Sequence, residues 1–307
     1  MSSSLWLAPM AGISDRAFRH ICIEYGAGLT YSEMVSAAGL MHASQKTWQY
    51  IEPANNEKSF VVQLFGHEKD VMLKAALEVQ KRLGNRLAGI DLNMGCPVRK
   101  VVSKGEGSAL MKTPELAYSL VETLVKALDV PVSVKFRSGW TNEEITAVEF
   151  GLLMQQAGAS FVAVHARSAR QFYKGKANWE VIADVASALD VPVVGSGDVF
   201  SFEDVQNMRA QTGCDAVMVA RGARGNPWIF KSSIDKKPYL PSMQERIECA
   251  RYYLELYCSY YGQEYLVPMR AKLAPFIHGM PQATCARRKL SSAKTRQDFE
   301  EVLSFLE

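Results

Sequence analysis

The sequence predicts a (β/α)8 barrel followed by a small all-helical domain. Eight short apolar runs recur along the chain, and successive runs start 24 to 42 residues apart, about one strand–helix unit. The runs are rich in Val, Ile, Leu and Phe and barely alternate, as expected for parallel strands covered on the outside and packed within. They are Leu5–Met10, Leu29–Val35, Phe60–Gly66, Ala88–Asn93, Val130–Arg137, Phe161–Arg167, Val191–Ser196 and Ala216–Arg221. Eight units favour a closed barrel. An open doubly wound sheet is the alternative.

Helices are expected between these runs, at residues 68–83, 114–128, 143–157, 178–189 and 201–211. Three of them begin with a cap or first-turn signal: Thr113 before Pro114, Thr141 before two glutamates, and Ser201 before Glu203. A short internal sequence repeat supports a repeated structural unit, because residues 127–132 and 188–193 are both Ala-Leu-Asp-Val-Pro-Val, 61 positions apart. Each copy reads as a helix end, a turn and the start of a strand.

The domain boundaries follow from the change of pattern near the C-terminus. We expect a barrel over residues 1–230, a linker over 231–241 and a helical domain over 242–307. Met243–Tyr261 and Asp298–Leu306 are the clearest helical segments of the last part.

Composition narrows the class of protein. The chain has 307 residues, 48% hydrophobic and 22% charged, which excludes a disordered, collagen-like or coiled-coil chain. It contains no apolar run long enough for a membrane span and no basic signal-peptide start, so we expect a cytoplasmic protein. Six cysteines without a CxxC pair suggest free thiols and no metal site. Five of them (Cys22, Cys214, Cys249, Cys258 and Cys285) are expected to be small buried hydrophobes.

The net charge of +3 is unevenly distributed. Between positions 270 and 297 there are seven basic residues and no acidic one before Asp298, while the rest of the chain is mildly acidic. The basic residues are Arg270, Lys272, Arg287, Arg288, Lys289, Lys294 and Arg296. Such a patch suggests a polyanionic partner, although a solvated helix face would look the same.

Reactive groups of a barrel enzyme stand at the carboxyl ends of its strands. Glycines 195, 197 and 222 in the last two strand–helix loops favour a phosphate site, to which Arg221 could add charge. Lys135 is expected to point into the barrel mouth, where a lysine must meet an anion or react, and His165 holds the same place on the next strand. Cys96 begins the longest loop of this face, and its protonated thiol could donate a proton.

Five motifs, in order along the barrel, resemble those of the dihydrouridine synthases, flavin-dependent enzymes that reduce uridine in transfer RNA. They are Ala8-Pro9-Met10-Ala11-Gly12, Asp91-Leu92-Asn93-Met94-Gly95-Cys96-Pro97, Lys135-Phe136-Arg137-Ser138-Gly139-Trp140, His165-Ala166-Arg167 and Arg221-Gly222. The Asn-Met-Gly-Cys-Pro form looks most like the bacterial B-type branch. The helical C-terminal segment fits the RNA-binding domain of the family.

The resemblance implies a role for each matching residue. FMN would lie over Pro9, Met10 and Ala11, with Gln63 at its edge and His165 lining it. Lys135 would stabilise the anionic reduced flavin, and NADPH would be the reductant. The flavin phosphate would be held by Ser196, Gly197, Asp198, Ala220 and Arg221. Ser196 stands where the family usually has asparagine, so a side-chain contact to phosphate is in doubt there.

The remaining implied roles concern the substrate. Asn93 would position the uracil, and Cys96 would protonate C5 as hydride reaches C6. RNA contacts would come from Arg137, Arg167, Arg270, Lys272, Arg287, Arg288 and Lys289. A stacked uracil cannot reach a flavin in a barrel mouth, so it must be flipped out. A monomer with tRNA as its partner is expected.

Three classes of function stay open from the residues alone. They are a flavin-dependent RNA reductase, a small-molecule barrel enzyme and a catalytically silent RNA-binding barrel. The small-molecule enzyme could reduce a free pyrimidine with FMN or form a Schiff base on Lys135.

Overall fold

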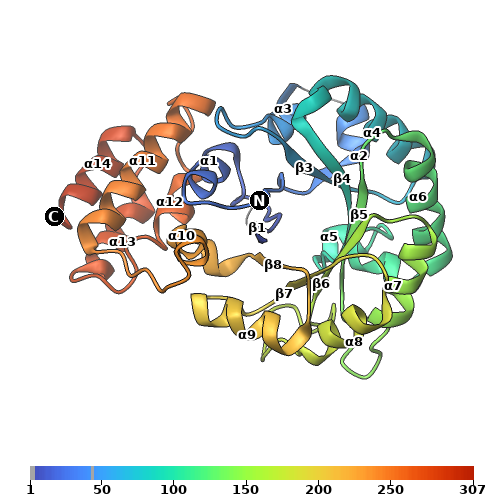
Figure 1. The fold of residues 1–307 in the computed structure, drawn as a ribbon. Coiled ribbons are helices and arrows are strands. Elements are labelled where there is room, and N and C mark those ends of the chain that lie inside the picture. Colours follow the sequence, from blue (N-terminus) through green and yellow to red (C-terminus); the bar gives the residue numbers. More distant parts are fainter. Residues whose placement is uncertain (1–3, 43–44) are drawn as a thin grey trace.

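Eight parallel strands surround the centre of the molecule in the order β1-β8-β7-β6-β5-β4-β3-β2. The structure, a computed structural model, describes residues 4–42 and 45–307. The strands are β1 (Leu5–Leu7), β2 (Val35–Ser36), β3 (Phe60–Phe65), β4 (Leu87–Met94), β5 (Val132–Arg137), β6 (Phe161–His165), β7 (Val193–Ser196) and β8 (Ala216–Val219). The predicted barrel is confirmed. Figure 1 shows the strands curling round with helices outside them.

The barrel closes between β1 and the segment before β2. Trp6 pairs with Leu29, and Tyr31 pairs with Val61, as single parallel bridges. The continuous strand predicted for Leu29–Val35 is therefore wrong in its extent. At Ser32 the side-chain hydroxyl accepts the hydrogen bond from Gln63 N at 3.0 Å, which interrupts regular strand pairing. The short strand β2 resumes the pairing beside β3.

Helices cover the outside of the barrel. They are α1 (Arg16–Glu24), α2 (Ala37–Met41), α3 (Gln45–Trp48), α4 (Lys69–Leu83), α5 (Arg99–Val102), α6 (Pro114–Ala127), α7 (Ala147–Gln156), α8 (Glu180–Ala188), α9 (Phe202–Thr212) and α10 (Trp228–Asp235). The Ser201 cap is confirmed as a capping box with Asp204. The Thr141 cap is wrong, because α7 begins only at Ala147.

The internal sequence repeat corresponds to a repeated local structure. In the first copy, Gln80 of α4 receives a hydrogen bond from Asp129 N and donates one to its carboxylate. In the second copy, Gln155 of α7 makes the same pair of bonds with Asp190. Both turns lead into a strand that begins two residues later than the predicted apolar run. The same helix-to-turn contact therefore holds two separate units of the barrel.

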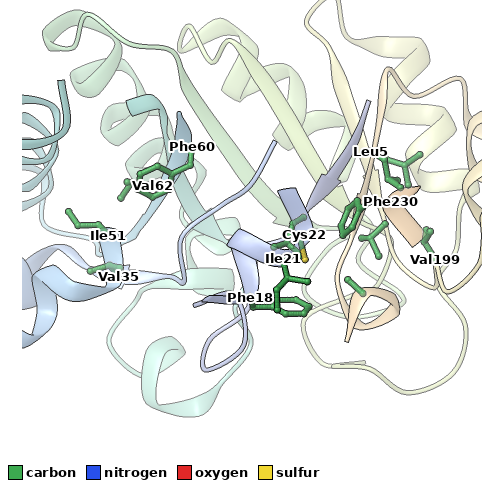
Figure 2. Close-up of a cluster of buried hydrophobic side chains, with 14 of the residues drawn as sticks. Leu5, Phe18, Ile21, Cys22, Val35, Ile51, Phe60, Val62, Val199 and Phe230 are labelled. Carbon is green, nitrogen blue, oxygen red and sulfur yellow. The ribbon is translucent and has the colours of Figure 1, made fainter. Parts of the chain in front are cut away.

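Side chains on the two faces of the strands form two cores. A small cluster fills the barrel interior and includes Ala8, Val61, Ala163, Val194 and Met218. The larger cluster lies between the strands and the helices. Figure 2 shows part of it, where apolar residues of α1 approach Leu5 and Phe230. Burial on both faces explains why the strand sequences barely alternate in hydrophobicity.

The C-terminal part is helical, as expected, with α11 (Met243–Tyr261), α12 (Met269–Leu273), α13 (Ala283–Ser292) and α14 (Arg296–Ser304). Figure 1 shows these helices on one side of the barrel, and α11 packs against α1. The predicted linker starts too early, because α10 continues to Asp235. Among the described residues, no helix is both long and apolar enough to cross a membrane.

Candidate active site

A cavity of about 440 Å³ opens at the carboxyl ends of the strands. This volume falls in the usual range for small-molecule and cofactor sites. The structure brings most of the predicted site residues together here. Its lining includes Pro9, Met10, Ala11, Asn93, Cys96, Lys135, Arg137, His165, Ser196, Gly197, Asp198, Ala220 and Arg221. Gln63 and Arg167 are not part of this lining.

The alternation of the strands explains which side chains reach the cavity. In β5, Val134 and Phe136 belong to the outer core, whereas Ser133, Lys135 and Arg137 face inward. In β6 the same alternation points His165 inward, next to Arg137 of the paired strand. Lys135, Arg137 and His165 therefore all reach the mouth. His165 pairs with Arg137, whereas Lys135 pairs with Ala163, so the expectation that His165 holds the place of Lys135 on the next strand is wrong by two residues.

The ammonium of Lys135 has no direct anionic partner among the described residues. Among the described residues it forms no hydrogen bond and no salt bridge, although its side chain lines the cavity. Burial and the neighbouring Arg137 lower the pKa of Lys135 to about 8, while Asp91 opposes the shift. A buried ammonium without a partner is costly unless an anionic or electron-rich group faces it. The cavity is therefore prepared for such a group.

A buried chain of hydrogen bonds supports the cavity floor. Gln63 donates to the Asp91 carboxylate at 2.7 Å, and Ser133 donates to its other oxygen at 2.6 Å. Asn93 donates to Gln63 Oε1 at 2.8 Å. Burial raises the pKa of Asp91 to about 6, against the bonds from Ser133 and Gln63. Gln63 thus lies beneath the cavity and orients Asn93.

Asn93 in turn fixes the loop that carries Cys96. Its Oδ1 accepts from Cys96 N at 2.9 Å and from Gly95 N at 3.2 Å. Burial raises the pKa of the Cys96 thiol, although a backbone hydrogen bond from Val98 and the charge of Arg137 lower it. The thiol is consequently protonated at neutral pH and can act as an acid.

The other end of the Cys96 loop packs back against its start. Ser108 N donates to Cys96 O at 3.0 Å. Gly107 has φ +61°, and a Cβ there would lie 2.7 Å from Cys96 O. This position therefore needs glycine both for its backbone conformation and for the close approach. The contact closes the loop at its base and holds the thiol beside the cavity.

Arg137 ties together the loops around the cavity. Its guanidinium donates to Gly95 O at 2.6 Å, to Ser168 O at 3.0 Å and to Phe172 O at 2.9 Å. All these acceptors are neutral carbonyls, so burial lowers the pKa of Arg137 to about 10. Arg137 remains charged at neutral pH, and the cavity stays electropositive.

His165 is neutral in this setting. Burial lowers its pKa well below the usual value, and the surrounding cations Lys135, Arg137, Arg167 and Arg221 lower it further. A neutral imidazole offers one donor and one acceptor nitrogen to a ligand.

The loops after β7 and β8 interlock on one side of the cavity. Asp198 accepts hydrogen bonds from Arg167 at 2.6 Å and from Arg221 at 2.9 Å, joining both loops. A Cβ at Gly222 would lie 2.0 Å from Val199 O, so only glycine permits this packing. Gly197 and Asp198 have positive φ angles of 128° and 54°.

These loops leave backbone donors free. Among the described residues, no hydrogen bond uses the N–H groups of Gly197, Asp198 or Val199. All three residues line the cavity. Successive unpartnered N–H groups near a positive φ angle are a common anion-binding arrangement. Arg167 is buried below them and acts on this loop through Asp198.

Only some of the basic residues predicted to form a patch on the C-terminal helices are exposed to solvent. Arg287, Arg288 and Lys289 are exposed on α13, whereas Arg270 donates to Ala293 O at 2.7 Å. The expectation for Lys272 is corrected, because its ammonium is buried against Asp15 at 2.6 Å and Gly12 O at 2.5 Å. The expectation that Cys285 is buried is wrong as well, because it is exposed.

Several cavity residues escaped sequence analysis. Tyr173, Phe200 and Arg224 line the mouth, and Arg221 lies 5.2 Å from the Tyr173 ring and 5.4 Å from the Phe200 ring. They come from loops and carry no pattern that would single them out. Asp91 could have been predicted from the sequence, because it stands two positions before Asn93 and therefore on the same inward-facing side of β4.

The closed barrel and the reactive groups gathered at its mouth define a (β/α)8-barrel enzyme. The sequence model of the dihydrouridine synthases (Dus) matches residues 6–307. The chain belongs to this family, which confirms the resemblance given by its motifs.

Individual relatives agree with this assignment. The chain is 36% identical over 311 residues to a probable tRNA-dihydrouridine synthase 1 of Synechocystis sp., covering 99% of this chain and 86% of the relative. It is 34% identical over 269 residues to tRNA-dihydrouridine synthase B of Pasteurella multocida, covering 86% and 80%. Among solved structures, histamine dehydrogenase from Rhizobium sp. 4-9 has a TM-score of 0.55 at 13% identity, covering 82% of this chain and 49% of that chain. This last likeness concerns the fold alone.

Proposed function

We propose that the protein reduces the C5=C6 bond of specific uridines in tRNA to give 5,6-dihydrouridine. FMN would occupy the mouth cavity, NADPH would supply electrons, and Cys96 would be the proton donor. Membership of the dihydrouridine synthase family supports the reaction. The printed names of the relatives support tRNA as substrate. NADPH rests on the motif resemblance.

The residues of the cavity fit FMN. The unpaired Lys135 and the free N–H groups of the β7 loop offer cationic and donor contacts to an anion. Gly197 and Gly222 allow the loops that carry these donors to pack closely, because a Cβ at either position would clash with neighbouring protein atoms. Ser196 in place of asparagine leaves these backbone donors unchanged. When bound, FMN supplies the hydride that adds to C6 of the uracil.

The protein supplies the acid. Because burial raises the pKa of Cys96, its thiol holds a proton at neutral pH and would deliver it to C5. Asn93, near the end of β4, holds the backbone of this residue and would contact the uracil beside it. Lys135 and Arg137 would add positive charge beside the ring carbonyls.

The observation that carries the proposal is the protonated thiol of Cys96 on the rim of a cavity that also holds a lysine without a direct anionic partner among the described residues. Cys96→Ala tests it with tRNA that lacks dihydrouridine. We expect NADPH to reduce bound flavin at the normal rate, and dihydrouridine measured by mass spectrometry to form about 100-fold or more slowly. Cys258→Ala, on α11 outside the cavity, should keep full turnover. Full turnover by Cys96→Ala would refute the assignment.

The lowered pKa of Lys135 also suits a Schiff-base enzyme, because only a neutral amine attacks a carbonyl. Family membership argues against this second candidate. Borohydride trapping in the presence of carbonyl substrates decides between them, since a covalent adduct on Lys135 would favour the lyase.

A further inference from the structure

A second cavity, of about 260 Å³, lies on the other side of the Cys96 loop. We call it the outer cavity. Pro97, next to Cys96, lines both cavities. The loop after β6 is shared in the same way, since Phe172 lines the outer cavity and Tyr173 lines the mouth. The two sites are therefore neighbours, separated by the residues that follow Cys96.

Two aromatic side chains form part of the outer cavity. Trp140 is half-buried, and Lys112 lies 4.8 Å from its ring. Phe172 is 43% exposed and has φ +55°, a strained conformation for a bulky residue. Its carbonyl accepts a hydrogen bond from Arg137, and its N–H donates to Ala169 O at 3.3 Å. The active-site arginine thus helps to hold an exposed ring beside the mouth.

Polar groups complete the outer cavity. Ser108 lines it and is fully buried, yet its hydroxyl has no hydrogen-bond partner among the described residues. Arg99 and Arg170 also line the cavity and are exposed. The loops at 97–112 and 166–178 contain only one acidic residue, Glu106. Their basic residues are Arg99, Lys100, Lys104, Lys112, Arg167, Arg170, Lys174 and Lys176.

Aromatic rings beside guanidinium groups are the chemistry that recognises a single-stranded nucleotide. We propose that the outer cavity binds the RNA nucleotide next to the reacting uridine. Its base would stack on the exposed ring of Phe172, and its phosphate would face Arg99 and Arg170. This inference rests on the proposed function, because it requires RNA as the substrate.

Connectivity of the substrate supports this occupant. A uridine in the mouth cavity stays covalently joined to a nucleotide on each side, and these neighbours must leave across the rim. The outer cavity lies directly past Pro97 at that rim. RNA would then be held on this side of the mouth as well as by the exposed cations of α13.

The test combines a protein change with a substrate change. Phe172→Ala should weaken binding of unmodified tRNA about fivefold or more, as measured by equilibrium titration, because one base loses its stacking partner. Phe172→Tyr should restore most of the affinity. Arg170→Gln should reduce the salt dependence of binding by about one phosphate contact. Leu77→Ala, on α4, removes an apolar side chain of similar exposure, 40%, and should change neither quantity.

The substrate change assigns the site to one nucleotide. RNA that lacks the base on either side of the target uridine is prepared as two abasic substrates. For one of them, wild-type affinity should fall about as much as with Phe172→Ala, and the two changes together should cost little more than either alone. Additive losses with both abasic substrates would overturn the proposal.

The outcomes also separate this inference from the proposed function. Wild-type protein that forms no dihydrouridine contradicts the proposed function itself. If the wild type is active and Phe172→Ala leaves RNA affinity unchanged, the outer-cavity inference alone is wrong. A raised KM for NADPH with unchanged RNA affinity would also overturn it, because the cavity would then serve the reductant.

Discussion

Lys272→Met tests how tightly the C-terminal helices are fastened to the active-site loop. The Lys272 ammonium of α12 bonds the Asp15 carboxylate at 2.6 Å and Gly12 O at 2.5 Å. Both charged side chains are more than nine-tenths buried, so solvent screens them little. Breaking a buried ion pair by removing one partner costs about 3–5 kcal/mol.

The expected loss lies near the lower end of that range. Asp15 would keep hydrogen bonds from Ala17 N at 2.9 Å, Phe18 N at 3.0 Å and the Tyr253 hydroxyl at 2.7 Å. We therefore expect Lys272→Met to lower the free energy of unfolding by about 3 kcal/mol at pH 7. FMN affinity should fall too, because Gly12 ends the loop whose residues 9–11 line the mouth cavity.

Urea unfolding of the whole chain, followed by fluorescence and circular dichroism, measures this loss from the shift in midpoint at constant slope. Lys237→Met, which removes an exposed cation, should change stability by less than about 0.5 kcal/mol. Lys272→Met combined with Asp15→Asn should cost less than the sum of the single variants. A loss below about 1 kcal/mol for Lys272→Met would contradict the reasoning, since a buried charge cannot be left unpaired so cheaply.

Two further predictions concern charge. In ligand-free protein, burial and the charge of Arg137 lower the pKa of Lys135 from 10.5, the ordinary value for a lysine, to about 8. The unfolded state therefore binds this proton more tightly, and stability relative to Lys135→Met should rise by about 3 kcal/mol as pH rises through that window. Urea midpoints at several pH values check this, and a flat difference would contradict it. Replacing Arg287, Arg288 and Lys289 with glutamine should weaken tRNA binding several-fold and lower its salt dependence, while flavin stays bound. Unchanged affinity in a filter-binding titration would mark this patch as a solvated helix face.

Local pattern was sufficient to predict much of the barrel and the mouth. Runs that are buried on both faces identified the strands, and alternation within β5 correctly pointed Lys135 inward. The repeated turn was visible because its Asp129 and Asp190 make the same contacts to a neighbouring helix. These features depend on residues close together in the sequence or on one strand's periodicity.

The failures involve partners distant in the sequence. Lys272 looked like a surface cation because its segment is basic, but it lies 257 positions from Asp15 and is buried by that contact. Ser32 ended a predicted strand because its hydroxyl replaces a backbone acceptor for Gln63, 31 positions away. No periodicity encodes either contact. The outer cavity escaped notice for the same reason, since its lining comes from three separate loops.

The place where the barrel closes has a consequence for motion. Between β1 and the segment before β2, the described residues form two backbone hydrogen bonds with each other, Leu7 N to Leu29 O and Gly28 N to Leu5 O, each 2.9 Å. By contrast, β3 and β4 pair over several consecutive residues. Opening fluctuations of the cylinder should therefore concentrate at this junction, where few bonds must break. The segment that follows β1 carries Pro9 and Met10. Local opening of the barrel at this junction would therefore displace the residues on which the isoalloxazine ring is proposed to lie.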